Sequence, residues 1–138
     1  MDSLKVKDYM SARPVTFKAD MSLSAALDKL LASNQTGGPV IDNEEHVVGF
    51  LSEQDMIQTL LKASYYCQDT NIVSDCMRRD VLTVTPDDTL IELAQAMSGQ
   101  KPKVYPVTVD SRLVGIITRR DVLRAIGSSI GECSKHPV

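Results

Sequence analysis

The chain contains an internal repeat: residues 6–57 align with residues 73–123 at an offset of 67, which falls to 66 where the second copy lacks one turn residue. Apolar positions correspond almost throughout the two copies. A unit of about fifty residues is marginal as an independent fold, because so small a domain buries too little of its surface. The repeat therefore predicts two copies that bury their faces against one another, with two related clefts between them.

Each copy has the pattern strand, helix, strand, strand, helix, which predicts a mixed α/β (α+β) fold. In the first copy, residues 14–17 are expected to be extended, and apolar spacing predicts a helix over 22–33. Residues 39–42 and 47–51 are expected to form a hairpin, followed by a helix with its apolar face around Met56. The second copy repeats this order as an extended segment 81–85, a helix beginning at the capping-box signature Thr89–Glu92, strands 104–109 and 113–118, and a closing helix with Val122, Leu123 and Ile126.

The composition is 43% hydrophobic and 24% charged, which is typical of a soluble globular protein. No apolar run approaches the roughly 20 residues that span a bilayer, and the N-terminus lacks the features of a signal peptide. Three scattered cysteines make a poor disulfide framework. These features predict a cytoplasmic protein that does not enter a membrane.

The formal net charge of −3 provides no electrostatic reason to bind nucleic acid or an anionic membrane. The charge is unevenly distributed. Residues 1–71 carry 6 basic and 10 acidic side chains, whereas residues 72–138 carry 9 basic and 8 acidic ones. A small anionic ligand is therefore expected to favour the second half.

The pattern Gly-φ-φ-Ser/Thr-x-x-Asp-φ, with φ apolar, occurs at residues 49–56 and again at 115–122, entering the last helix of each copy. Together with Pro-Val in the preceding strand, it resembles the cystathionine β-synthase (CBS) domain family. The resemblance covers residues 4–126. The two units are placed at 4–61 and 72–126. The segment 62–71 between them is predicted to be a helix end and linker, and the Ser-rich residues 127–138 are predicted to form a flexible tail.

Membership of that family implies a tandem pair packed about a pseudo-twofold axis. The clefts between the halves are expected to bind an adenosine-containing ligand, namely AMP, ADP, ATP or S-adenosylmethionine. The resemblance also implies a homodimer, and we expect a free-standing regulatory module that signals to a protein partner the sequence does not identify. The sequence contains no Ser/His/Asp or Cys/His arrangement and no Gly-rich phosphate loop, so neither an enzyme nor a required cofactor is expected.

The resemblance also assigns site residues. The acid of each motif is expected to hold ribose hydroxyls, the motif hydroxyl to contact ribose or phosphate, and the preceding segments to line the base and the opposite wall. The first site comprises Ser52, Asp55, Val15, Thr16, Gly38, Pro39 and Val40, and the second comprises Thr118, Asp121, Thr83, Val84, Tyr105, Pro106 and Val107, with Arg119 and Arg120 beside its hydroxyl.

Two interpretations of the motif remain open. A carboxylate can accept hydrogen bonds from both hydroxyls of a ribose, and a hydroxyl at a helix N-terminus lies beside unpaired N–H groups that bind phosphate. A capping box, with the hydroxyl as N-cap and the acid three residues on, explains the same residues without a ligand. The alternative function is therefore a ligand-free interaction or dimerisation module.

The two sites are expected to differ in charge. Arg119 and Arg120 follow Thr118, whereas Glu53 and Gln54 follow Ser52, so the second site is predicted to bind an anion better. Lys101 and Lys103 precede the second site and add to its positive charge. The pair Arg78-Arg79 either lies on the surface or reaches a ligand phosphate from the opposite side of the cleft. Cys133-x-x-His136 has metal-ligand spacing, but the sequence offers too few further ligands for a metal site.

Overall fold

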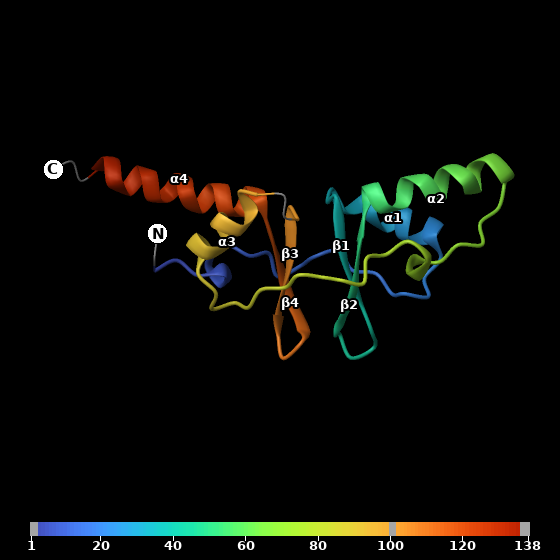
Figure 1. Ribbon diagram of the computed structural model, residues 1–138, viewed down its shortest axis with the longest axis horizontal. Helices are drawn as coiled ribbons and strands as arrows, with labels where there is room; N and C mark the ends of the chain where they lie inside the picture. Colours follow the sequence, from blue (N-terminus) through green and yellow to red (C-terminus); the bar gives the residue numbers. More distant parts are fainter. Residues whose placement is uncertain (1–2, 100–101, 136–138) are drawn as a thin grey trace. The chain divides into compact units, whose positions relative to one another are not determined.

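A computed structural model describes residues 3–99 and 102–135 (Figure 1). In this part of the chain, four α-helices accompany two antiparallel sheets of two strands each, so the α+β prediction is confirmed. The chain divides into two compact units that do not follow chain order. The first-hairpin unit comprises residues 13–82 and 110–113. The second-hairpin unit comprises the segment before Arg13, residues 83–109 and residues from 114 onward.

In the first-hairpin unit, helix α1 (Leu23–Ser33) confirms the predicted helix. Its N-cap is Ser22, whose Oγ accepts a hydrogen bond from the Ala25 amide at 3.2 Å. The helix ends at Asn34, which has a left-handed φ of 59°. The inward face of α1 belongs to a core made of Val15, Phe17, Leu23, Ala26, Leu30, Val40, Leu51, Met56, Val73 and Met77.

Strands β1 (Gly37–Ile41) and β2 (Val47–Ser52) form the predicted hairpin. Phe17 extends this sheet on one side, because its amide donates to the Pro39 carbonyl at 3.1 Å and its bridge to β1 is parallel. On the other side, Arg78 forms an antiparallel bridge with Phe50 of β2. The unit therefore places an extended segment along each edge of its hairpin.

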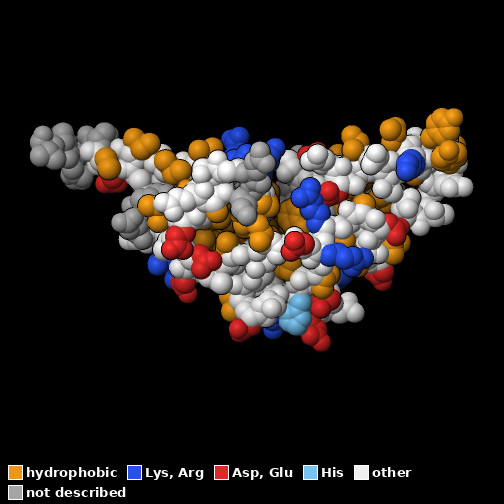
Figure 2. All heavy atoms as spheres, viewed as in Figure 1, with side chains coloured by type: hydrophobic (Ala, Val, Ile, Leu, Met, Phe, Trp, Pro, Cys, Tyr) orange, Lys and Arg blue, Asp and Glu red, His pale blue; other side chains and the backbone are white. Residues whose placement is uncertain are grey.

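Helix α2 (Glu53–Tyr66) continues past Leu61, into the predicted linker, before the 3₁₀ turn η2 (Val73–Asp75) begins. Its predicted apolar face is only partly inward. Met56 is buried, but Ile57 is 67% exposed. Figure 2 shows hydrophobic side chains on the surface of this helix, where the exposed residues are Ile57, Leu61, Tyr65 and Tyr66.

The second-hairpin unit repeats the arrangement. It contains the 3₁₀ turn η1 (Val6–Asp8), helix α3 (Leu90–Met97), strand β3 (Val104–Val109), strand β4 (Arg112–Thr118) from its third residue onward, and helix α4 (Arg119–Lys135). Val84 forms a parallel bridge with Val107 of β3, and Ser11 forms an antiparallel bridge with Ile116 of β4. The core consists of Val6, Leu90, Leu93, Met97, Tyr105, Val107, Ile117, Val122 and Ala125.

Helix α4 corrects the predicted C-terminal boundary, because it runs through Gly127 to Lys135 where the sequence suggested a loose tail from 127. A glycine in a helix interior costs only about 1 kcal/mol, which packing can offset. Ile126 and Ile130 lie along a groove of about 470 Å³ shared with Ile91 of α3. Residues 136–138, including His136, lie outside the described residues. No helix between residues 3 and 99 or between 102 and 135 is long and apolar enough to cross a membrane.

Candidate functional site

The first-hairpin unit brings together the hydroxyl and the acid of its motif where β2 ends and α2 begins. Ser52 Oγ accepts a hydrogen bond from the Asp55 amide at 3.2 Å and donates to Asp55 Oδ2 at 2.7 Å. The other carboxylate oxygen, Oδ1, accepts from Arg78 Nε at 3.2 Å. The Asp55 side chain is 14% exposed. Both oxygens of this acid therefore have an intramolecular donor.

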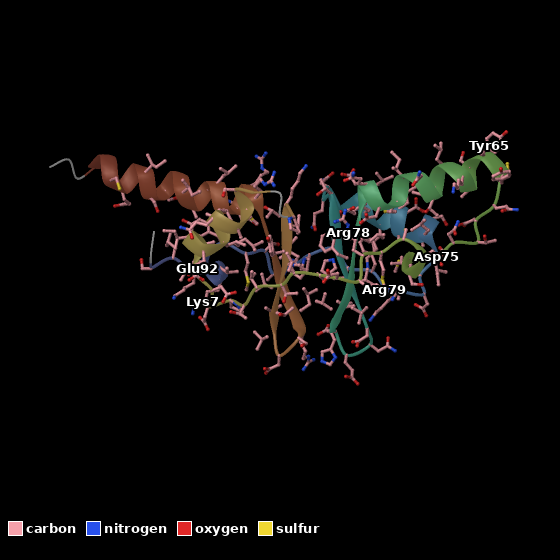
Figure 3. The ribbon with its side chains drawn as sticks, in the orientation of Figure 1. Lys7, Tyr65, Asp75, Arg78, Arg79 and Glu92 are labelled. Carbon is pink, nitrogen blue, oxygen red and sulfur yellow. The ribbon has the colours of Figure 1, made fainter. Side chains whose placement is uncertain are left out.

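Arg78 reaches Asp55 because its backbone pairs with β2. The Phe50 and Arg78 amides each donate to the other residue's carbonyl at 2.8 Å. At Gly49, a Cβ atom would lie 2.8 Å from the Arg78 carbonyl oxygen and 2.7 Å from Met77 Sδ. The close approach of this segment therefore explains the glycine that opens the motif. Figure 3 labels Arg78 beside β1 and β2, near the start of α2.

The second-hairpin unit forms a reciprocal capping box at its motif. The Thr118 amide donates to Asp121 Oδ2 at 2.8 Å, and the Asp121 amide donates to Thr118 Oγ1 at 3.2 Å. Asp121 Oδ1 pairs with Arg124 Nη2 at 2.6 Å, one turn further along α4. The capping interactions weighed from the sequence are therefore present here. Sequence reasoning missed Arg124, although its i+3 spacing from Asp121 was a usable signal.

Arg119 and Arg120 begin α4, as expected. The Arg119 amide donates to the Lys103 carbonyl at 2.9 Å, which anchors the helix start to the loop before β3. Its Nε atom is buried and has no hydrogen-bond partner among the described residues. Leaving a buried donor unsatisfied costs about 1–3 kcal/mol, and more for a charged group. Arg120 and Lys103 are exposed, and Lys101 lies outside the described residues.

The predicted wall residues lie in the same unit as their motif. In the first-hairpin unit, Gly37 pairs in register with Ser52, so the strand through Gly38, Pro39 and Val40 runs beside the motif. These wall residues are buried, as is Val15, whereas Thr16 is partly exposed. In the second-hairpin unit, Tyr105, Pro106 and Val107 are buried, Val84 is partly exposed and Thr83 is exposed.

The two walls differ at one repeat-related position. A Cβ atom on Gly38 would lie 2.2 Å from the Val15 carbonyl oxygen, so this position has no room for a side chain. The corresponding residue in the second copy is Tyr105, whose side chain belongs to the core of its unit. Burial raises the pKa of the Tyr105 hydroxyl above its usual value. The two walls therefore share Pro-Val but differ at the preceding residue, which is Gly38 in one copy and Tyr105 in the other.

Of the Cys133-x-x-His136 pattern, His136 lies outside the described residues. Over residues 3–99 and 102–135, no group of three or more His, Cys, Asp or Glu side chains is arranged to hold a metal ion. Cys76 is partly buried, and burial, followed by the negative charges of Asp55 and Asp75, raises the pKa of its thiol. A raised pKa disfavours the reactive thiolate at neutral pH.

The sequence pattern of the CBS domain matches this chain twice, at residues 6–62 and 73–128. The chain belongs to the CBS domain family. Among solved structures, the CBS domain pair of protein MJ0100, in complex with 5′-methylthioadenosine and S-adenosyl-L-methionine, is 29% identical with a TM-score of 0.76, covering 91% of this chain and 98% of that one. CBSX2 from Arabidopsis thaliana, in complex with AMP, is 30% identical with a TM-score of 0.76, covering 90% and 96%.

Longer CBS-containing proteins also match. An uncharacterized protein of Methanocaldococcus jannaschii is 29% identical over 123 residues, which cover 89% of this chain and 43% of that protein. An A-adding tRNA nucleotidyltransferase of Aquifex aeolicus is 32% identical over 123 residues, which cover 89% of this chain and 14% of the enzyme. The chain thus spans less than half the length of these curated relatives.

Proposed function

We propose that this CBS pair binds an adenosine-containing ligand, either AMP, ADP, ATP or S-adenosylmethionine, and regulates a protein partner in response. The observation that carries the proposal is the buried Arg119 Nε, which lacks a partner among the described residues beside Thr118 and Asp121. A ligand phosphate at this helix start would satisfy the orphaned donor. Supporting it, two CBS structures of 29–30% identity were solved with adenosine-containing ligands.

Asp121 retains the capacity to bind a ribose despite its capping role. Each carboxylate oxygen has two acceptor positions, and Oδ1 and Oδ2 each use one, for Arg124 and the Thr118 amide. Two positions remain for a ribose diol. Cap and ligand residue are therefore compatible roles. The proposal assigns Thr118 to ribose or phosphate, Arg119 and Arg120 to phosphate, and Thr83, Val84, Tyr105, Pro106 and Val107 to the walls.

The first site uses Asp55 and Ser52 in the same roles, with Val15, Thr16, Gly38, Pro39 and Val40 as its walls. Binding can regulate a partner only if the ligand has a different affinity for two arrangements of the protein. The proposal assigns no chemical step to the chain.

The second candidate function is a ligand-free interaction module, which the exposed apolar residues favour. Ile57 and Leu61 on α2, and Leu123 and Ile130 on α4, are exposed. Such residues are typical of surfaces that bind another protein. In either function, the proposal includes a homodimer through a twofold interface. Light scattering at micromolar concentration should then give twice the 15.1 kDa chain mass, and a monomer mass would contradict the dimer.

Thermal unfolding with and without ligand distinguishes the two functions. At ten times Kd, a single site stabilises the protein by about 1.4 kcal/mol, which raises Tm by roughly 3–5 °C. Adenine ribonucleotides or S-adenosylmethionine should produce this shift, whereas GMP and deoxy-AMP should produce less. If millimolar AMP, ADP, ATP and S-adenosylmethionine all leave Tm unchanged, the ligand-free function is correct.

A further inference from the structure

We propose that Arg78 makes the Asp55 site selective for adenosine ligands that carry a phosphate. This inference rests on the proposed function and extends it to the ligand class of one site. Arg78 lies outside the motif, and it reaches Asp55 from a segment 23 residues further along the chain. The fold brings the two together through the backbone pairing of Arg78 with Phe50.

The guanidinium of Arg78 is hydrogen-bonded through Nε, whereas its two terminal nitrogens are available to a ligand. Its Nε donates to Asp55 Oδ1 at 3.2 Å, and neither terminal nitrogen has a hydrogen-bond partner among residues 3–99 and 102–135. The side chain is 61% exposed. An arginine presents its terminal nitrogens as a planar fork that matches two phosphate oxygens. Asp55 therefore orients an arginine whose anion-binding end remains available.

Charge makes Arg78 decisive at this site. Asp55 and Glu53 lie in the first turn of α2, and the sequence of that turn, residues 53–56, contains no Lys or Arg. Two carboxylates would repel a phosphate that approached the helix start. The neighbouring Arg79 is turned elsewhere, because its Nη2 donates to the Ser74 carbonyl at 3.3 Å. Without Arg78, the negative charge of this site would favour a neutral or cationic ligand.

The second-hairpin unit supplies its positive charge from a different element. The residue that corresponds to Arg78 in the repeat is Ser11, which makes the equivalent backbone pairing with Ile116. There the basic side chains Arg119 and Arg120 stand at the helix start instead. Each site therefore has an arginine, but at the Asp55 site it comes from the segment that pairs with β2, and at the Asp121 site it comes from the start of α4. At the Asp55 site, AMP should consequently bind more tightly than adenosine or the sulfonium-bearing S-adenosylmethionine.

The test measures AMP and adenosine binding to the full chain by NMR titration, with the Gln54 amide reporting the Asp55 site and the Arg120 amide reporting the Asp121 site. Arg78→Ser installs the residue found at the equivalent place in the other copy. It should weaken AMP binding at Gln54 at least tenfold, because a charged hydrogen-bond donor is lost, while adenosine binding stays within twofold. Arg78→Lys, which keeps the charge but loses the fork, should fall between Arg78→Ser and wild type.

Arg79→Ser is the matched control, since it removes the same charge one residue away and should leave both affinities unchanged. Equal loss of AMP and adenosine in Arg78→Ser would overturn the inference, because Arg78 would then only position Asp55. Unchanged AMP binding in that variant would also overturn it. If wild-type protein binds AMP at Arg120 but not at Gln54, the inference fails while the proposed function stands. If no ligand shifts either amide, both fail.

Discussion

The two copies of the motif form their hydrogen-bond networks in different ways. Asp121 is bound within its own helix start, by the Thr118 amide and by Arg124 one turn on. Asp55 is bound instead by the Ser52 hydroxyl and by Arg78 from a separate segment. One acid is therefore held by local contacts alone, and the other by one local and one tertiary contact. The comparison shows that two copies of one sequence motif can hold their acids with different hydrogen-bond partners.

This difference also determines how each site responds to changes elsewhere. The network around Asp121 spans residues 118–124, so it persists as long as the helix start is intact. The network around Asp55 depends on the pairing of Arg78 with β2. Displacement of that segment would remove both a strand partner and a positive charge from the Asp55 site.

The largest effect is expected where the two walls differ. Gly38→Ala should destabilise the protein by about 3 kcal/mol, the upper end of the overpacking range, because the new Cβ would meet the Val15 backbone carbonyl at 2.2 Å. Urea denaturation measures the loss as a lower midpoint with an unchanged slope. A loss below about 1 kcal/mol would show that the edge segment moves aside freely.

Asp121→Ala should cost about 2–3 kcal/mol of adenine-nucleotide binding, the range for a charged acceptor that bridges two ribose hydroxyls, which corresponds to a Kd roughly 30- to 150-fold weaker. As a cap alone, the same acid would contribute only about 1 kcal/mol to stability and leave affinity intact. Calorimetric titration of the folded variant separates these roles. Wild-type affinity in Asp121→Ala would make Thr118 and Asp121 a capping box and nothing more.

Asp55→Ala should have a smaller effect on the total nucleotide affinity, about 1.5 kcal/mol, because only the second motif carries arginines at its helix start. The same titration, performed on Asp55→Ala beside Asp121→Ala, compares the two directly. Arg78 loses its orienting partner in this variant. A greater loss of affinity in Asp55→Ala than in Asp121→Ala would reverse the predicted ranking of the sites.

The smallest effect tests the extended helix α4. Gly127 lies within the helix, and a Cβ atom there would meet nothing within 4 Å. Gly127→Ala should therefore stabilise the protein by up to about 1 kcal/mol, through the higher helix propensity of alanine. Thermal unfolding should show a higher Tm and circular dichroism an unchanged or greater helix content. A flexible tail at this position would produce no change in either measurement.

Local patterns predicted most of the secondary structure. The spacing of Leu23, Ala26 and Leu30 predicted α1, and the apolar runs on either side of a polar turn predicted each hairpin. The repeated motif identified the family, which the match at 6–62 and 73–128 confirms. These predictions succeeded because helix periodicity and turn chemistry are properties of neighbouring residues. The ligand assigned to the motif residues stays a prediction.

Exposure on the helices was harder to predict, because periodicity places residues on a face without saying how much of that face is covered. Met56 and Ile57 are adjacent apolar residues of α2, yet only Met56 is buried. The length of α4 was missed for a related reason. The local composition after Gly127 suggested a flexible tail, while the groove that Ile126 and Ile130 share with α3 is a tertiary feature.

The sequence by itself determined the repeat, the order of helices and strands, and the two capping motifs, since each rests on residues close together in the chain. Only the tertiary structure decided that the segment before Arg13 joins the second hairpin, while Arg78 joins the first. It thereby decided that the positive charge of Arg78 lies beside Asp55. A pairing between Asp55 and Arg78 spans 23 residues and leaves no local pattern, because it follows from backbone hydrogen bonds that any residue can form.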